Sequence, residues 1–374
     1  MNAPTLTLTR RVRSTPFTSR IESFGITSYT VYNHMLLATQ IVDVEDDYWH
    51  LRRAVQVWDV SCERQVEICG PDAARLAQML TVRDMREFPI GRCGYAPVVD
   101  GDGHLINDPV VTKVGDDRFW FSVSDSDVVL WAGGIAHALG LDVRVFEPDV
   151  WPLAVQGPYA EDVIATVFGE AVRDIRFFRF APLPFEDHEL IVARTGWSAQ
   201  GGFEIYVDDA ELGGRLFDAV MIAGDQHDIR PGCPNLIERL EAGLMTYGSD
   251  ITRDDTALEA GLGRFCALEA PIEAIGIEAL RRQKAEGVRR QIASIAIDGD
   301  RLPICRDPWP VIADGRQVGS VTSAAWSPRL EINVALSMMA IEHAAVGSTV
   351  VVDTPDGARR ATVSTTPFPG ASQR

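Results

Sequence analysis

Lysine is almost absent from this chain. Of its 35 lysine and arginine residues, only Lys113 and Lys284 are lysines. Neither stands in a motif for Schiff-base chemistry or in a phosphate-binding loop, so we expect neither function. Positive charge is scarce as well, because the formal net charge is −18 at pH 7. This balance argues against non-specific binding to nucleic acid or to an anionic membrane.

Paired cysteines and long apolar runs are also missing. None of the six cysteines forms a CxxC pair, and no histidine lies at ligand spacing from them. We therefore expect no structural zinc, no iron–sulfur cluster and no other bound metal. The sequence has no apolar run of about 18 residues, and its N-terminus lacks the apolar core of a signal peptide. These features predict a cytoplasmic protein with reduced thiols.

The length and the hydrophobic pattern indicate a mixed α+β protein of several domains. With 374 residues the chain exceeds one compact core, and its 46% hydrophobic and 24% charged content is ordinary. Apolar spacing predicts helices over 43–54, 72–80, 127–139, 160–168, 212–223 and 235–244. Alternation predicts strands over 55–61, 65–69, 95–99, 105–114, 119–123, 151–156, 185–194 and 203–207, while 250–263 looks irregular. Beyond a composition change near Gly287, alternating segments predict a small antiparallel β-domain, at 291–297, 309–312, 317–323, 332–338 and 349–352.

The most informative motif is a glycine-dense turn that runs into a strand, over Thr195–Val207. The glycines would allow the backbone to approach a flat ligand. The strand would hold Glu204 on a rigid element, where its carboxylate can read a pair of N–H donors. The ordinary alternative is a hairpin whose strand glutamate faces water.

Two other polar residues have competing interpretations from the residues alone. Asp108, before Pro109, is either a turn residue or a carboxylate at a reacting centre. Arg239 lies on a predicted helix, where a ligand contact and a salt bridge to an acid such as Glu238 or Glu241 have equal weight.

Three other features have simpler interpretations. His34 and His50 have no nucleophile motif beside them, so packing or capping roles are favoured. The acidic residues of 43–47 match a helix N-terminus better than a metal site. Gly261 and Gly263 do not form a dinucleotide fingerprint, because no strand–helix unit surrounds them.

Several segments resemble, in order and spacing, the glycine-cleavage T-protein (aminomethyltransferase) family of folate enzymes. They extend from about residue 20 to the C-terminus and include Gly103–Asp108, Gly196–Tyr206, Arg239–Gly248, Glu259–Gly263, Gly319–Ser323 and Ser327-Pro328. Further segments resemble the branch of this family that demethylates sulfonium compounds: Arg13–Arg20, Tyr32–His34, Asp47–Leu51, Glu63–Ile68, Gly91–Cys93 and Pro231–Arg239.

The resemblance implies a three-domain α+β fold with a central folate-binding channel and a C-terminal antiparallel β-domain. We expect a discontinuous folate-binding domain at 1–54 and 148–260, a second α+β domain at 55–147, and a barrel-like domain at 261–374. The implied reaction moves a methyl group from dimethylsulfoniopropionate, or a close sulfonium, to N5 of tetrahydrofolate. Its products would be 5-methyltetrahydrofolate and 3-methylthiopropionate.

The resemblance also assigns site residues. Asp108 would lie beside folate N5 as the catalytic carboxylate, and Glu204 would bind the pteridine, together with Arg239, Tyr95 and Trp197. Aromatic faces suit a methylated cation, and the candidates for substrate contact are Trp197, Tyr32, Tyr206 and Phe17. The substrate carboxylate would need a donor, with Ser122, Ser124, Arg20 and Arg64 as candidates.

Two positions depart from the demethylase pattern and concern the methyl donor. Ala199 stands where a basic residue is expected, and Gly94 stands where bulkier residues are usual. Two other functions therefore remain open: a family enzyme using a methylated amine, betaine or methoxy donor, and a folate-binding protein without catalysis. The expected partners are small molecules and, in a homodimer, a second copy of the chain; neither nucleic acid nor membrane is expected.

Overall fold

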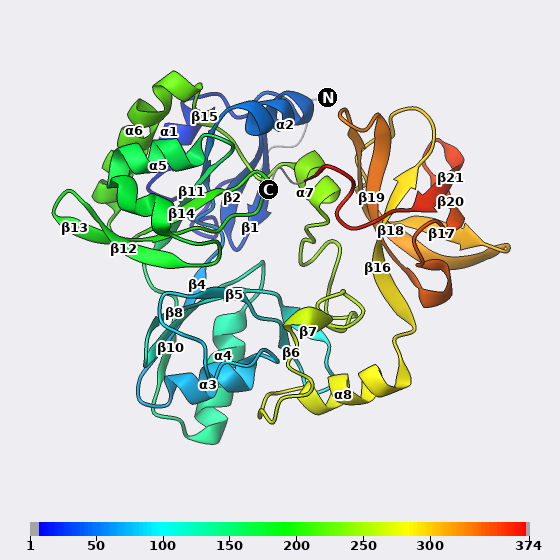
Figure 1. Ribbon diagram of the computed structural model, residues 1–374, viewed down its shortest axis with the longest axis horizontal. Coiled ribbons are helices and arrows are strands. Elements are labelled where there is room, and N and C mark those ends of the chain that lie inside the picture. The colour runs from blue at the N-terminus through cyan, green and yellow to red at the C-terminus, as the bar shows by residue number, and fades with distance from the viewer. Residues whose placement is uncertain (1–6, 372–374) are drawn as a thin grey trace.

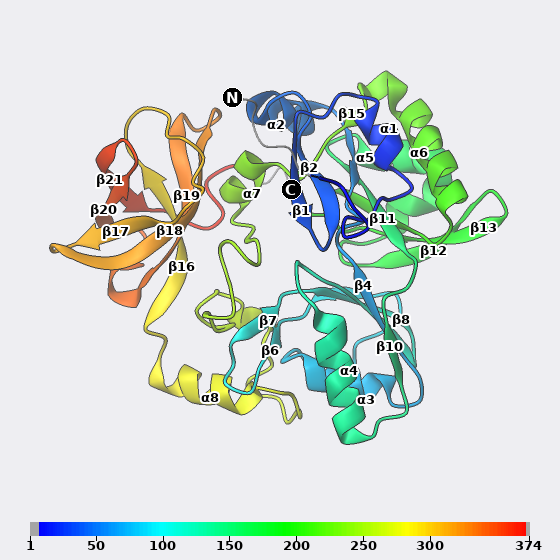
Figure 2. The same cartoon turned by 180° about the vertical axis from the view of Figure 1, so that it is seen from behind.

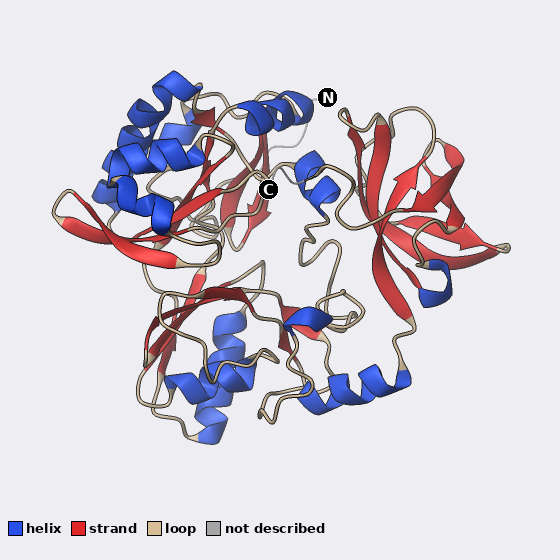
Figure 3. Cartoon of the chain, in the orientation of Figure 1, coloured by secondary structure: helices blue, strands red, loops and turns tan. Residues whose placement is uncertain are grey.

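The computed structural model describes residues 7–371 and has three bodies arranged around the middle of the molecule (Figures 1 and 2). Two bodies combine sheets and helices, and the third is a closed β-barrel built almost entirely of strands (Figure 3). The predicted α+β class and the C-terminal antiparallel domain are confirmed. Within the described residues, no helix is long and apolar enough to cross a membrane.

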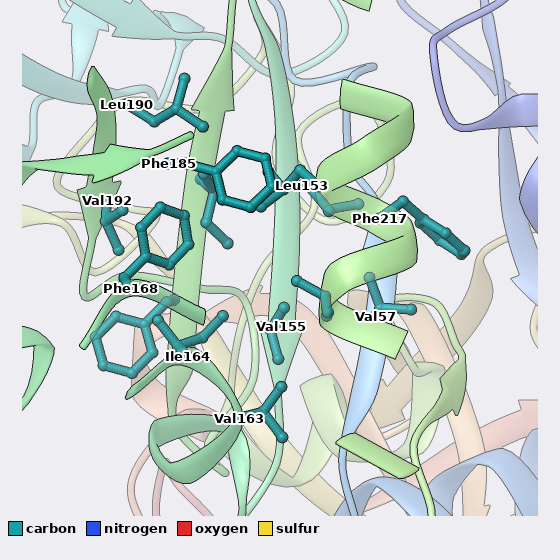
Figure 4. Close-up of a cluster of buried hydrophobic side chains, with 14 of the residues drawn as sticks. Val57, Leu153, Val155, Val163, Ile164, Phe168, Phe185, Leu190, Val192 and Phe217 are labelled. Atoms are coloured by element: carbon teal, nitrogen blue, oxygen red, sulfur yellow. The ribbon is translucent and has the colours of Figure 1, made fainter. Parts of the chain in front are cut away.

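The first body contains a six-stranded sheet with helices packed on it. The strand order is β12 (Phe180–Phe185), β13 (His188–Ala193), β14 (Gly202–Val207), β11 (Trp151–Gln156), β3 (Gln56–Asp59) and β15 (Arg230–Pro231). Its helices are α1 (Thr18–Glu22), α2 (Val44–Arg53), α5 (Ala160–Phe168) and α6 (Ala210–Gly224), and β1 (Ser28–Tyr32) pairs with β2 (Met35–Gln40). Apolar side chains of α5 and α6 meet those of the sheet in one core (Figure 4). Because β14 lies between β11 and β13, its residues are buried along the whole strand.

The second body contains a five-stranded antiparallel sheet and two helices. The strand order is β10 (Arg144–Phe146), β4 (Gln65–Cys69), β9 (Arg118–Ser122), β8 (Val110–Gly115) and β5 (Cys93–Tyr95). Helices α3 (Ala73–Leu80) and α4 (Val128–Leu139) pack on it, and β6 (Val98–Val99) pairs with β7 (Leu105–Asn107). The chain leaves β7 directly into the segment that carries Asp108, which places this residue at the edge of the body.

The third body is a closed barrel. Its strand order is β16 (Arg290–Ile297), β19 (Ile332–Ala340), β18 (Arg316–Ser327), β17 (Trp309–Ala313), β20 (Thr349–Thr354) and β21 (Gly357–Val363). Helices α7 (Leu236–Ala242) and α8 (Ile277–Glu286) lie on the chain that leads to it. Short 3₁₀ turns occur at Glu170–Asp174, Asp225–His227, Gly263–Phe265 and Ile341–His343. The five predicted barrel strands are confirmed, whereas β21 and α8 were not predicted.

Two of the predicted domain boundaries do not match the packing. Strand β3 pairs with β11 in the first sheet, so the boundary after residue 54 falls too early by at least this strand. Residues 262–280 share a hydrophobic core with Val82, Val99 and Leu105 of the second body, so they do not belong to the barrel, which begins at Arg290. The division of 1–374 into domains stays a prediction, and these contacts favour boundaries after β3 and before β16.

Candidate active site

A cavity of about 560 Å³ lies where the three bodies meet. Its wall contains seven of the residues predicted for the site, together with Glu63 and, from the segment between β16 and β17, Ile304. The seven are Tyr32, Tyr95, Asp108, Ser122, Ser124, Trp197 and Arg239. Two other hollows, of about 520 Å³ each, are lined by residues around Trp49 and around Phe88, and neither contains a predicted site residue. The predicted residues that line a hollow of this size thus lie together in one cavity.

Asp108 follows β7 and is almost fully buried, with 7% of its surface exposed. The Tyr95 hydroxyl donates to one carboxylate oxygen, and Ser124 Oγ donates to the other at 2.9 Å. Burial raises the pKa of Asp108 from its ordinary 3.8 to about 6, although the Tyr95 and Ser124 hydrogen bonds oppose this shift. An aspartate held in this way is oriented toward the cavity rather than serving only as a turn residue.

Glu204 projects from β14 into a buried position behind the cavity wall. Its carboxylate accepts hydrogen bonds from Thr195 Oγ1 at 2.5 Å and from the Tyr206 hydroxyl at 3.4 Å. Burial raises the pKa of Glu204. The alternative in which this glutamate faces water is wrong, because β14 is a central strand. Contact of Glu204 with a pteridine stays a prediction.

The glycine-dense turn is shaped by Gln156 of β11. A Cβ on Gly196 would lie within 2.2–2.5 Å of the Gln156 amide, and a Cβ on Gly202 within 2.2 Å of the Val155 carbonyl oxygen. Gln156 in turn donates to the Thr195 carbonyl at 3.3 Å and accepts from Ser198 Oγ at 2.8 Å. These glycines therefore allow close packing within the protein, and the turn they form holds Trp197 in the cavity wall.

Arg239 forms a buried ion pair, which was one of its two predicted roles. Its Nη1 donates to Asp250 at 2.7 Å and to the Leu244 carbonyl at 3.2 Å, and its Nη2 donates to Ser323 Oγ at 2.7 Å. The guanidinium carbon also lies 5.9 Å from the centre of the Trp197 ring. Arg239 thereby links α7, the following loop and barrel strand β18, and its guanidinium lies beside Trp197.

Of the residues predicted to contact the substrate, Tyr32, Ser122 and Trp197 line the cavity and two do not. Tyr206 is buried behind the wall and packs against Trp120 at a ring distance of 5.6 Å. Phe17 is fully buried in the core of the first body, 6.4 Å from the Phe217 ring, so the structure does not support its predicted substrate contact.

The residues predicted to donate hydrogen bonds to the substrate carboxylate also separate into two groups. Ser122 and Ser124 line the cavity, with Ser122 Oγ donating to Gln65 at 2.8 Å. Arg20 forms an ion pair with Asp218 at 2.8 Å, and Arg64 pairs with Glu147 at 3.1 Å. Neither arginine lines the cavity.

Tyr32 lies at the end of β1, next to a residue that fixes its position. Asn33 adopts a left-handed conformation with φ of 47°. Its side-chain amide donates to three carbonyls, those of Cys62 at 2.9 Å and of Val123 and Ser124 at 3.2 Å each. One amide group therefore ties the β1–β2 turn of the first body to the edge of the second.

Glu63 is a wall residue that the sequence did not single out. It lies between β3 and β4, faces the cavity, and its carboxylate has no hydrogen bond or ion pair within residues 7–371. Burial raises the pKa of Glu63, and the charges of Glu204 and Asp108 add to the effect. In the sequence it appeared only as the first residue of a motif, and nothing in the local pattern distinguishes it from a surface glutamate before a strand.

None of the three carboxylates of this site has a cationic partner within residues 7–371. Hydroxyl groups donate to Asp108 and Glu204, and no arginine or lysine forms an ion pair with Glu63, Asp108 or Glu204 in the described part of the chain. The cavity wall therefore combines aromatic faces with negative charge that the protein leaves unbalanced. Such a wall suits a cation without a large hydration shell.

The two departures from the family pattern lie outside the cavity wall. The backbone N–H of Ala199 donates to Glu238 at 3.2 Å, in a turn that packs on α7. At Gly94, a Cβ would lie 2.9 Å from the Phe88 ring, so the absence of a side chain permits this packing. Neither residue lines the cavity.

The histidines and the acidic segment have structural roles or none at this site. His34 is exposed in the β1–β2 turn, and His50 on α2 contacts the Asp228 carbonyl at 2.8 Å, so they form no pair. Asp43 caps α2 by accepting from the N–H groups of Glu45 and Asp46, as the helix N-terminus prediction requires. The described residues contain no cluster of three or more metal-binding side chains.

Comparisons with known proteins now decide the family. The model of the GCVT N-terminal domain matches residues 22–270, and that of the glycine cleavage T-protein C-terminal barrel domain matches 290–369. The chain belongs to the glycine cleavage T-protein family. The second match begins at β16, in agreement with the start of the barrel.

Individual relatives of the T-protein family cover almost the whole chain. A dimethylsulfoniopropionate demethylase of Ruegeria pomeroyi is 52% identical over 95% of this chain and 96% of its own length. An aminomethyltransferase of Symbiobacterium thermophilum is 31% identical over 89% of this chain and 91% of its own length. The crystal structure of the glycine cleavage system aminomethyltransferase T from Bartonella henselae has the same fold, with a TM-score of 0.85 over 96% of this chain and 99% of that one, at 22% identity.

Proposed function

We propose that this T-protein family member is a tetrahydrofolate-dependent demethylase. It transfers a methyl group from dimethylsulfoniopropionate, or a close sulfonium, to N5 of tetrahydrofolate. The products are 5-methyltetrahydrofolate and 3-methylthiopropionate. The demethylase of Ruegeria pomeroyi supports this assignment by its 52% identity over nearly the full length of both chains.

The single structural observation that carries the proposal is the unbalanced negative charge of the aromatic cavity. A sulfonium has a positive charge on sulfur, and the cavity offers it Tyr32 and Trp197 as aromatic faces and Asp108 and Glu63 as carboxylates. A neutral methoxy donor would gain less from these carboxylates, because it brings no charge to balance them.

The chemistry needs positioning more than acid–base activation. The leaving group of a sulfonium is a neutral thioether, so no protein acid has to protonate it. Bound tetrahydrofolate supplies the lone pair of N5 as the methyl acceptor. Holding two reactants in line can contribute about 7–11 kcal/mol.

Asp108 has the geometry of a fixed anion for this reaction. Its two hydrogen bonds, from Tyr95 and Ser124, hold the carboxylate in place before any ligand arrives. As positive charge moves from sulfur towards the acceptor nitrogen, a fixed and poorly solvated carboxylate stabilises the transition state.

The size of the cavity is that of a small-molecule site. Its volume of about 560 Å³ is within the usual range for small-molecule sites, roughly 300–1,000 Å³. Glu204 and Tyr95 are proposed to bind the pteridine. For Arg239, the buried pair with Asp250 favours a supporting role, in which it holds Trp197 rather than directing its main donors at the ligand.

The experiment that tests the proposal is a panel of methyl donors. The purified protein is incubated with tetrahydrofolate and dimethylsulfoniopropionate, a betaine, a methylated amine or a methoxy compound, and folate products are separated by chromatography. We expect 5-methyltetrahydrofolate with the sulfonium and little with the others. A 5,10-methylene product would contradict simple methyl transfer, and folate binding without turnover on any donor would support a non-catalytic folate-binding protein.

Cellular location and oligomeric state belong to the same proposal. A cytoplasmic location accords with the six free cysteines of the structure. A homodimer is proposed on the basis of the sequence prediction alone, and light scattering of the purified protein tests it directly.

A further inference from the structure

We propose that Glu63 is an ionisable counter-ion for the sulfonium. It releases a proton when the cation binds, and it recovers one after the methyl group has left sulfur. The inference rests on the proposed function, but it concerns a residue and a proton balance that the function itself does not specify.

The position of Glu63 is the first support. Its backbone N–H donates to the Val60 carbonyl at 2.9 Å, which closes the turn between β3 and β4 and directs the side chain to the cavity. The groups that interact with it electrostatically come from several elements: Glu204 and Tyr206 of β14, Asp108 after β7, Tyr32 of β1, and the neighbouring Cys62. These are carboxylates, phenols and a thiol, and none of them is a cation.

Hydrogen bonding separates Glu63 from the other two carboxylates. Asp108 accepts a hydroxyl at each oxygen, and Glu204 accepts two at one oxygen. The Glu63 carboxylate accepts no hydrogen bond from residues 7–371. It is therefore the one carboxylate of the three that faces the cavity without a hydrogen-bond partner. Its charge is therefore the least stabilised by the protein and the most sensitive to a ligand.

This environment makes the protonation of Glu63 depend on what the cavity contains. Desolvation and the charges of Glu204 and Asp108 raise its pKa, so near neutral pH the ligand-free protein holds it largely as the neutral acid. A sulfonium in the same cavity acts in the opposite direction, because an opposite charge favours the ionised form. Binding of the cation is then coupled to the release of a proton.

The methyl-transfer reaction restores the initial protonation state of Glu63. The carbon–sulfur bond breaks and its electron pair stays on sulfur, while the N5 lone pair forms the new bond to the methyl carbon. N5 of tetrahydrofolate begins as a secondary amine, so its proton has to leave once the methyl group is attached. The sulfonium has by then become a neutral thioether, and Glu63 takes up a proton again.

Calorimetry can measure the proton release directly. Dimethylsulfoniopropionate is titrated into the protein alone and into the protein saturated with 5-methyltetrahydrofolate, which prevents turnover, in two buffers of different ionisation enthalpy. We expect release of up to about one proton per site near pH 7, decreasing as the pH rises and Glu63 ionises before binding. 3-Methylthiopropionate serves as the matched ligand, because it has the same carboxylate without the positive charge, and it should release no proton.

Substitutions then assign the proton to a residue. Glu63→Gln should abolish the release and raise KM for the sulfonium about 30-fold or more, with a smaller change in kcat. Glu63→Asp should restore part of the release. Glu67→Gln is the control, since Glu67 lies four residues along and binds Arg118 and Trp120 outside the cavity. It should leave the proton release unchanged.

The outcomes separate this inference from the proposed function. Sulfonium binding and turnover without proton release, or release that persists in Glu63→Gln, would overturn the role of Glu63 and leave the demethylase assignment standing. Absence of both binding and turnover with the sulfonium would instead contradict the demethylase assignment, and with it the role of Glu63.

Discussion

Two sets of buried or half-buried carboxylates in this protein differ in the groups that bind them. The cavity set has hydroxyl partners or none, and its members are Glu63, Asp108 and Glu204. The junction set lies around α7, where the first body meets the barrel, and each member is bound by arginine. Its pairs are Glu238 with Arg52 at 3.1 Å, Glu241 with Arg329 at 2.7 Å, and Asp250 with Arg239 at 2.7 Å.

The difference shows which negative charges hold the fold together and which are left for a ligand. A buried carboxylate paired with an arginine is costly to disrupt, because removing one partner leaves the other charge without compensation. A buried carboxylate without a cation raises its own pKa and destabilises the folded protein when it ionises. The cavity set is therefore suited to binding a cation, and the junction set to joining the bodies.

The largest effect should follow from breaking the junction set at Glu241. This side chain is fully buried and accepts from Tyr48, Ser327 and Arg329. Glu241→Gln leaves the Arg329 guanidinium without its counter-ion, and we expect it to lower the free energy of unfolding by about 3 kcal/mol. Urea denaturation followed by circular dichroism measures the change.

A surface ion pair provides the control for that substitution. Glu186 and Arg215 pair at 2.9 Å with both side chains more than 40% exposed. Glu186→Gln should change the free energy of unfolding by less than about 0.5 kcal/mol. Equal losses in the two variants would contradict the distinction between buried and exposed pairs.

The next largest effect should come from Asp108, in the cavity set. Asp108→Asn keeps the shape of the side chain but removes its charge and replaces one of its two acceptor oxygens by an amide donor. We expect kcat to fall about 100-fold or more, with folate affinity nearly unchanged. Turnover assays together with fluorescence titration of folate measure the two quantities, and unchanged turnover would rule out the proposed role.

The smallest effect should be a pH-dependent gain of stability in Asp108→Asn. Burial raises the pKa of Asp108 to about 6, against an unfolded value near 4. The folded protein therefore loses stability as the pH rises from about 4 through about 6, and the loss is complete above that range. Asp108→Asn should exceed the wild type in free energy of unfolding by about 1–2 kcal/mol at pH 7.5 and by less at pH 5. A gain that is larger at pH 5 would contradict the assignment.

Local chemistry explains which parts of the fold the sequence could predict. The helix that begins after Asp43 has a capping side chain at its N-terminus, and barrel strand β20 alternates clearly between buried and exposed residues. Helix α8 was missed because it begins after Gly276 without a capping side chain and carries many charged residues. Strand β3 was predicted as a strand but assigned to the wrong body, since its partner β11 is distant in the sequence.

Prediction of the site from the sequence has the same limit, because contacts between distant parts of the chain cannot be read from local patterns. Asp108, Trp197 and Tyr32 were selected from the family motifs, and all three line the cavity, while their roles stay predictions. Glu63 also stands in one of these motifs, but the sequence did not single it out, because its closeness to Asp108 and Glu204 arises only when separate parts of the chain fold together. Phe17 was misassigned for the complementary reason, since nothing local to an aromatic residue distinguishes a cavity wall from a core.

Asn33 determines how the cavity meets its ligands. Its side-chain amide holds the turn beside Tyr32 against three carbonyls of the neighbouring body before any substrate is present. The loss of conformational entropy in this turn therefore occurs during folding and not during binding. A donor that enters the cavity meets a wall that is already ordered, so its association rate should reflect diffusion and desolvation rather than the closing of a loop.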